Sequence, residues 1–191
     1  MTNSWLAAYF RETVEIAQQI DLDAIDSIVT RLVRLRSERG RLFLCGVGGS
    51  AGNCSHAVND FRKLALIDAS TPVDNVSELT ARTNDDGWDR VFSDWLKVAR
   101  PTSRDVLFIL SVGGGNRERN VSPNVVSVVD AAKTCGMDVL GIVGPEGGYT
   151  KDHGDIVVVI PTVNPKNITP QTEAFQAVLL HGIVCDPRLM A

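Results

Sequence analysis

The chain repeats one order of features: a short apolar run, a glycine-containing loop and an amphipathic helix. The clearest run, Val106 to Leu110, is apolar at every position, as a parallel strand covered on both faces should be. This alternation predicts an α/β fold with a doubly wound, mainly parallel sheet flanked by helices. The other strands are expected at 41–47, 137–144 and 155–161, and the helices that follow strands at 51–66, 122–135 and 170–184.

Two further amphipathic helices, at 4–19 and 22–38, are expected before the sheet. Their apolar stripes include Trp5, Tyr9 and Phe10. Helices that follow strands already cover much of such a sheet, so this surplus apolar surface indicates an interface between subunits. At 191 residues, we expect the whole chain (1–191) to form a single domain, with helices 1–38 in that interface.

Composition and charge exclude several classes of protein. Apolar residues make up 44% of the chain and charged residues 22%, as in an ordinary soluble protein. A net charge of −4 argues against non-specific nucleic-acid binding. No apolar run reaches the roughly 18 residues of a membrane span, and early charges argue against a signal peptide. Four cysteines without a CxxC pair fit a reduced, cytoplasmic protein.

Two of the expected strands end in loops rich in glycine, at 46–50 and 111–116. Glycines let backbone amides approach an anion, and a following helix N-terminus adds partial positive charge. The sequence GVGGSAG does not match GxGxxG, and no P-loop ending follows. Asp68 follows a helical stretch rather than a strand, so no carboxylate is expected at the ribose position. We therefore expect a phosphorylated ligand and no NAD. The alternative is that the first loop is only a tight turn.

A family resemblance begins at residues 46–56, which read GVGGSAGNCSH. This segment resembles the GNGGS-x5-H segment of sugar isomerase (SIS) domains, specifically the sedoheptulose 7-phosphate isomerase (phosphoheptose isomerase) group. The resemblance covers most of the chain and implies the SIS fold with a five-stranded sheet. The further matches, in order, are Asn84-Asp85 with Gly87, the run VLFILSVGGGN at 106–116, Cys135-Gly136-Met137, the turn at 144–148 and His181.

The resemblance implies an aldose–ketose isomerase that converts sedoheptulose 7-phosphate to a heptose 7-phosphate through an enediol. Such a reaction needs a base, an acid and neutralisation of developing oxyanion charge. Carried over from the family, Asp60 and His181 are the catalytic residues. Two imidazoles and two carboxylates are donors that zinc accepts. The resemblance therefore implies a divalent ion, zinc, held by His56, Asp60, Glu173 and His181.

Two of these positions depart from the family. Asp60 stands where the family has Glu, which shortens the side chain by one methylene. Glu173 stands where the family has Gln, which adds a negative charge. On one ideal helix, Glu173 and His181 would lie about 12 Å apart, so both reach one ion only if residue 173 is bent away from the helix or two subunits share the site. As alternatives, His56 and Asp60 form an ordinary helix-surface pair, or His181 is a core histidine.

The second loop also departs from the family, because it is longer and has lost most of its hydroxyl groups. Arg117 and Arg119 are new in it, and arginine can grip phosphate bidentately; the alternative is a solvated loop. Ser122-Pro123 predicts a helix start with Ser122 as the N-cap. The expected substrate-binding residues are Gly48, Gly49, Ser50, Asn84, Asp85, Ser111, Gly113, Asn116, Arg117 and Glu173.

Two functions from different classes remain open at this point. The first is the phosphosugar isomerase. The second is a non-catalytic SIS module, either a sugar-phosphate sensor or a scaffold such as the replication-initiator-associating protein; the shortened Asp60 favours it, whereas the retained His56 and His181 favour the enzyme. The resemblance further implies a homotetramer whose active sites lie between subunits, which would ease the Glu173–His181 distance.

Overall fold

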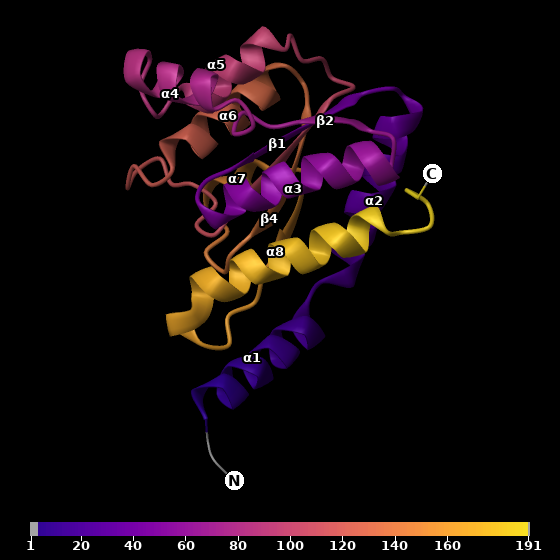
Figure 1. Cartoon of the computed structure of the whole chain (residues 1–191), viewed down its shortest axis with the longest axis vertical. Coiled ribbons are helices and arrows are strands. Elements are labelled where there is room, and N and C mark those ends of the chain that lie inside the picture. Colours follow the sequence, from indigo (N-terminus) through magenta and orange to yellow (C-terminus); the bar gives the residue numbers. More distant parts are fainter. Residues whose placement is uncertain (1–3, 191) are drawn as a thin grey trace.

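The structure is a computed structural model that describes residues 4–190, and these residues contain a five-stranded, all-parallel sheet (Figure 1). The strands are β1 (Arg41–Gly46), β2 (Asp68–Ser70), β3 (Val106–Ser111), β4 (Asp138–Val143) and β5 (Ile156–Val159). Their order is β2-β1-β3-β4-β5. The predicted doubly wound sheet is confirmed. The order changes direction between β1 and β3, the position at which such sheets bind ligands.

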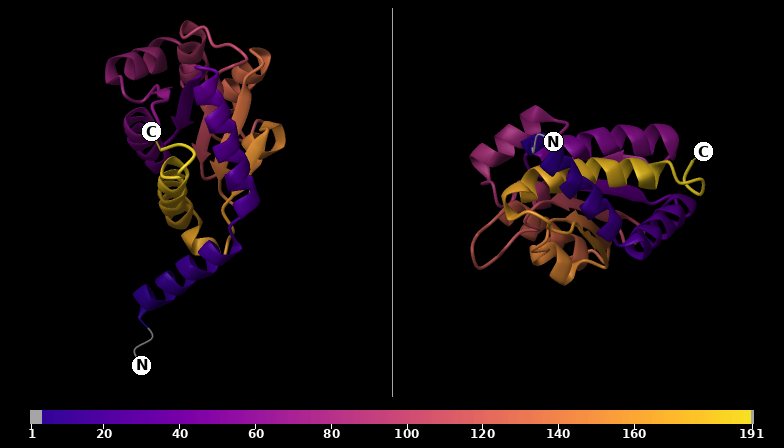
Figure 2. Two further views of the ribbon diagram at one scale, coloured as in Figure 1. Left: turned by 90° about the vertical axis from the view of Figure 1, so that its right-hand side faces the viewer. Right: turned by 90° about the horizontal axis from the view of Figure 1, so that it is seen from below.

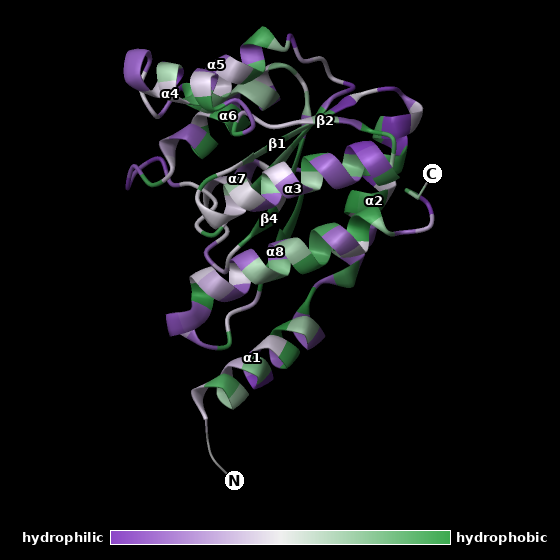
Figure 3. Cartoon of the chain, in the orientation of Figure 1, coloured by the Kyte–Doolittle hydropathy of each residue, from purple (hydrophilic) through white to green (hydrophobic). Residues whose placement is uncertain are grey.

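Helices cover both faces of this sheet. Over residues 4–190 they are α1 (Trp5–Gln19), α2 (Leu22–Ser37), α3 (Gly49–Leu64), α4 (Val76–Asp85), α5 (Val91–Val98), α6 (Pro123–Thr134), α7 (Gly148–His153), the 3-10 helix η1 (Pro165–Asn167) and α8 (Ile168–Val184). Leu42 and Leu44 of β1 enter a core with α2, α3 and α8, whereas Phe43 and Cys45 enter a second core with α5 and α6. Figure 3 shows the apolar strands between these more polar helices.

The first helix extends away from the body of the molecule (Figures 1 and 2). Ile16 is the one buried residue of α1. Trp5, Leu6, Phe10 and Val14 are each more than half exposed. The predicted N-terminal helical pair is confirmed, and the described part of the chain leaves much of the apolar surface of α1 uncovered.

The structure adds detail to two local predictions. Asp68 does not merely follow a helix but begins β2, a strand of three residues that pairs with β1 alone. Because Asp68 pairs in register with Arg41, the first residue of β1, it lies at the amino edge of the sheet, away from the ligand-binding edge. Ser122 does precede α6, with Pro123 at its start, but its φ of 46° is left-handed and its side chain makes no capping hydrogen bond.

The described helices include none with the length and apolar character needed to cross a membrane. All four cysteines are unpaired thiols. Cys45 and Cys54 are buried in the two cores, and burial raises the pKa of both thiols. These two cysteines therefore serve as small apolar core residues.

Candidate active site

The parallel neighbours α3 and α8 carry most of the candidate residues (Figure 1). Near their amino ends, the Asn53 amide donates to the backbone oxygen of Glu173 at 2.9 Å and to Gln176 Oε1 at 3.1 Å. About one and two turns further along α3, His56 and Asp60 meet His181 of α8. The two helices thus present one continuous polar seam, in which Asn53, His56 and Asp60 follow the i, i+3, i+7 spacing of one helix face.

Asp60 joins the two histidines. Its Oδ2 lies 3.2 Å from His56 Nε2 and 3.4 Å from His181 Nδ1, and the imidazole rings meet edge to face with centroids 5.1 Å apart. The side chain of Asp60 is 14% exposed, whereas those of His56 and His181 are 57% and 55% exposed. His181 is therefore not a core histidine, and the His56–Asp60 pair belongs to a group of three.

A neighbouring side chain orients this carboxylate. Asn59 Nδ2 donates to Asp60 Oδ1 at 3.0 Å, which leaves Oδ2 turned toward the histidines. The prediction from sequence missed Asn59, because adjacent residues of a helix usually point in different directions. Its amide fixes which oxygen of Asp60 is available for chemistry.

The donor atoms of His56, Asp60 and His181 all lie within 4.8 Å of one another, a spacing that one metal ion can span. Two imidazole nitrogens and one carboxylate oxygen match the three-ligand sets of catalytic zinc sites, which keep a fourth position for substrate or water. The residues present therefore fit a divalent ion. The exposure of both histidines leaves that fourth position open.

Glu173 does not join this group within one chain, contrary to the predicted set of four. It lies on α8 eight residues before His181, and α8 is one helix throughout this span. Its carboxylate lies against Gly49 instead, so closely that a Cβ at residue 49 would come within 2.4 Å of Glu173 Oε2. A side chain at position 49 would therefore displace the Glu173 carboxylate, which is the end of a long, flexible side chain.

The first glycine loop forms an open helix start. Gly48 precedes α3 with a φ of 66°, a conformation that favours glycine, and no side chain caps the helix there. Ser50, in the first turn, is 1% exposed, and its Oγ has no hydrogen-bond partner in the described part of the chain. A buried hydroxyl beside uncapped amides is a costly arrangement unless a ligand uses both. These features fit an anion at Gly48, Gly49 and Ser50.

In the second glycine loop, the polar side chains that were predicted to bind substrate make hydrogen bonds within the loop itself. Ser111 Oγ accepts a hydrogen bond from Gly114 N at 3.0 Å. Asn116 pairs by its backbone with Val121, and its Oδ1 accepts from Arg119 N at 2.7 Å. The side chains of Ser111 and Asn116 therefore hold the loop's own backbone. Gly113 lies between them, and a Cβ there would meet Val121 Cγ1 at 4.0 Å, an ordinary van der Waals contact.

The other predicted substrate ligands lie elsewhere. Arg117 Nη2 contacts Asp130 Oδ2 at 2.6 Å and Tyr149 Oη at 2.7 Å, so its charge is already compensated. The sequence did not indicate these two partners, and the hypothesis that Arg117 binds phosphate in place of lost hydroxyl groups stays a prediction. Asn84 and Asp85 lie exposed at the end of α4, where Asn84 Nδ2 donates to Asp85 Oδ1 at 2.8 Å.

Comparisons with known proteins agree with this arrangement. The SIS domain family model matches residues 8–144. Phosphoheptose isomerase from Chlorobaculum parvum is 33% identical over 165 residues, which cover 81% of this chain and 73% of that protein. The lincomycin biosynthesis protein LmbN from Streptomyces lincolnensis is 35% identical over 156 residues, but this match covers only 54% of its length.

Among solved structures, phosphoheptose isomerase from Neisseria gonorrhoeae superposes with a TM-score of 0.81 at 26% identity. The superposition covers 93% of this chain and 94% of that one. The sequence comparison and the structure comparison therefore find the same kind of protein, each over most of this chain. The chain belongs to the SIS domain family, and within it to the phosphoheptose isomerases.

Proposed function

We propose that this protein is an aldose–ketose isomerase that converts sedoheptulose 7-phosphate to a heptose 7-phosphate. The observation that carries the proposal is the Asp60 carboxylate, which is largely buried and lies between two half-exposed histidines. Proton transfer between adjacent carbons needs such a set of a base and nearby proton donors. The related proteins named phosphoheptose isomerase support the choice of substrate.

In this proposal, Asp60 Oδ2 removes a proton from the carbon beside the carbonyl group, and the enediol forms. His181 moves a proton between the two substrate oxygens, and His56 stabilises the charge that develops on them. Asn59 keeps Oδ2 directed at the reacting carbon. The amides at Gly48 and Gly49 and the hydroxyl of Ser50 hold the phosphate group.

The metal ion of this proposal is zinc, which His56, Asp60 and His181 would hold. With the ion bound, these donor atoms would be ligands and would not transfer protons, so the metal-bound and the proton-transferring forms of the group are alternative states. Such an ion would polarise the carbonyl group of the substrate as a Lewis acid. Protein purified without chelator should contain near-stoichiometric metal by elemental analysis, and the double variant His56→Ala/His181→Ala should lose it. Fully active protein without metal would remove the ion from the function.

The activity is tested by incubating purified protein with sedoheptulose 7-phosphate, with and without added zinc, and separating the aldose product. We expect product in at least one condition, and we expect Asp60→Asn to reduce kcat by about 10²–10⁴-fold, the usual effect of losing a general base. Absence of product in both conditions would favour the alternative, a non-catalytic sugar-phosphate module.

We further propose a homotetramer in which each active site combines residues of two chains. Ser50 and Asp60 are ten residues apart on α3, about 15 Å along the helix. We assign the phosphate to the cradle of one chain and the reacting carbons to Asp60 of its neighbour. The exposed apolar face of α1 supports the assembly.

Subunit complementation tests this sharing. Inactive Ser50→Asp and Asp60→Ala proteins are mixed after reversible dissociation, and activity should return, because some mixed sites carry neither lesion. The pair Asp60→Ala and His181→Ala is the matched control. It should not recover, because the 3.4 Å contact is made within one chain. Full activity in a protein that sediments as a monomer would contradict the shared site.

A further inference from the structure

The second glycine loop and the turn before α7 are packed together backbone to backbone. Gly114 has a φ of 67°, and a Cβ on it would come within 1.8 Å of the backbone oxygen of Gly147. The backbone oxygen of Gly115 accepts from Tyr149 N at 2.7 Å, and that of Gly114 accepts from Thr150 N at 2.9 Å. Loop carbonyl groups thus cap the amino end of α7, and the glycines of both segments are needed for this close approach.

Residues 116–121 form a separate excursion from this loop. The backbone of Asn116 and Val121 pairs through two hydrogen bonds, of 2.8 and 3.0 Å. The excursion is therefore closed at its base by this pair. It places Arg117 over α6 and α7.

Three side chains join the excursion to both helices. Asp130 of α6 accepts two hydrogen bonds, each 2.6 Å long. Its Oδ2 accepts from Arg117 Nη2, and its Oδ1 accepts from the hydroxyl of Tyr149. Arg117 Nη2 also lies 2.7 Å from Tyr149 Oη, and its guanidinium carbon is 4.9 Å from the centre of the Tyr149 ring. The Tyr149 ring stacks in turn on His153, with centroids 3.8 Å apart. Arg117, Asp130 and Tyr149 each contact the other two residues of this group of three.

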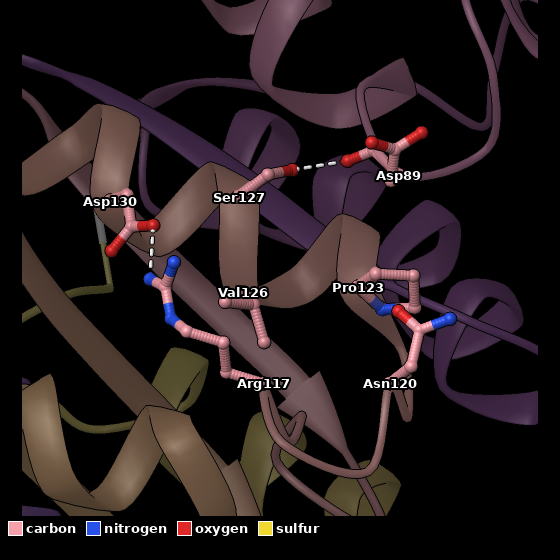
Figure 4. Close-up of a pocket in the computed structure, with 7 residues that line it drawn as sticks. All are labelled: Asp89, Arg117, Asn120, Pro123, Val126, Ser127 and Asp130. Carbon is pink, nitrogen blue, oxygen red and sulfur yellow. Dashed lines mark hydrogen bonds and ion pairs between the residues drawn. The ribbon is translucent and has the colours of Figure 1, made fainter.

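A hollow of about 220 Å³ lies beside this group, lined by Asp89, Arg117, Asn120, Pro123, Ser127 and Asp130 among others. Figure 4 shows the Arg117 side chain reaching across it to Asp130. The hollow contains none of the three residues of the His56–Asp60–His181 group. Arg117 therefore acts at a distance from the reacting carbons of the proposed function.

We propose that Arg117 is a positioning residue, which with Asp130 and Tyr149 forms a latch that fixes the loop Ser111–Asn116 against the turn before α7. Asp130 and Tyr149 share one nitrogen of Arg117, Nη2, and a phosphate group bound by this arginine would lie beside the Asp130 carboxylate, which repels it. Burial, followed by the hydrogen bond to Asp130, raises the pKa of Tyr149, so its hydroxyl stays protonated and remains a donor at neutral pH. Any role of Arg117 in catalysis rests on the proposed function. The contacts by which Arg117, Asp130 and Tyr149 hold the loop are independent of that function.

The variant Asp130→Asn separates a latch from a phosphate ligand, because the two roles predict different results. Loss of a latch loosens the loop, so trypsin should cleave after Arg117 and Arg119 about tenfold faster, whereas inorganic phosphate, held at Gly48, Gly49 and Ser50, should bind as before. If Arg117 were a phosphate ligand, removing its competing carboxylate would tighten phosphate binding. Tyr149→Phe keeps the ring and should also speed cleavage.

The matched control is Glu146→Gln, which weakens the 2.9 Å ion pair between Arg119 of the same excursion and the turn before α7. Both side chains of this pair are more than 60% exposed, so it contributes little to holding the loop. The variant should leave both cleavage and phosphate binding unchanged. Unchanged cleavage in Asp130→Asn and Tyr149→Phe would overturn the latch, as would tighter phosphate binding in Asp130→Asn. Because proteolysis needs no turnover, a protein inactive on sedoheptulose 7-phosphate can still confirm the latch while it refutes the proposed isomerase.

Discussion

Replacing Ser50 by alanine should change folding stability and substrate binding in opposite directions. The hydroxyl of Ser50 is buried in the first turn of α3 and has no partner in the described part of the chain. Alanine keeps the Cβ and removes only this oxygen. The substitution therefore leaves the packing of α3 unchanged while it removes a polar group that, without ligand, is buried for no gain.

The size of each effect follows from the cost of an unpaired buried polar group. Leaving a hydroxyl unsatisfied costs about 1–3 kcal/mol, so Ser50→Ala should raise the free energy of unfolding of ligand-free protein by about 1 kcal/mol. When phosphate is bound, the same hydroxyl donates to a charged oxygen, an interaction of about 1.5–3 kcal/mol. Its loss should raise KM for the sugar phosphate by roughly 10- to 100-fold.

Urea denaturation and initial-rate kinetics measure the two effects, and thermal stabilisation by inorganic phosphate measures binding without turnover. Ser55→Ala is the control on the same helix, since Ser55 Oγ donates to Asp74 Oδ1 at 2.5 Å on the surface. It should lower stability slightly and leave KM unchanged. A Ser50→Ala protein that is less stable than Ser55→Ala and has a normal KM would refute the reasoning.

Two further predictions concern carboxylates. Glu173→Gln removes a negative charge beside Gly49, so KM for the sugar phosphate should fall by roughly tenfold; a higher KM with loss of bound metal would instead make Glu173 a ligand. Asp105 is buried, which by itself raises its pKa, but hydrogen bonds from Arg41 and from Thr102 N outweigh this and lower the pKa below 3.8. The stabilisation of the folded protein by ionised Asp105 is thus fully present above pH 3.8, the ordinary pKa of the group, and is lost as the pH falls through the lowered pKa. Asp105→Asn should cost about 2–3 kcal/mol at neutral pH and weaken the loss of stability in acid; equal urea midpoints for both proteins at pH 7 would contradict this.

Long periodic segments of the sequence predicted the fold well. The run Val106 to Leu110 became β3 because it is apolar throughout and is buried on both faces, and the helices at 4–19 and 22–38 follow their apolar stripes. β2 was missed because its three residues carry no period of their own. It forms only where β1 offers a free edge, which is a property of the tertiary structure.

The candidate site divides in the same way. His56 and Asp60 were found because their i, i+4 spacing is local, whereas the contact with His181 depends on how α3 packs on α8 and was implied only by the family resemblance. Arg117 was assigned to phosphate because its partners lie 13 and 32 residues away, beyond the reach of any local pattern. Contacts distant in sequence therefore decide the partners of both Arg117 and Asp60.

The most direct test of the isomerase is NMR of sedoheptulose 7-phosphate incubated with the purified protein and zinc in D₂O. The proposed function predicts that an aldose heptose phosphate accumulates with deuterium at carbon 2, because the proton passes through Asp60, which exchanges with solvent. Asp60→Asn should yield neither product nor exchange on the same time scale. A substrate that keeps its ketose signals and takes up no deuterium, with and without zinc, would contradict the isomerase.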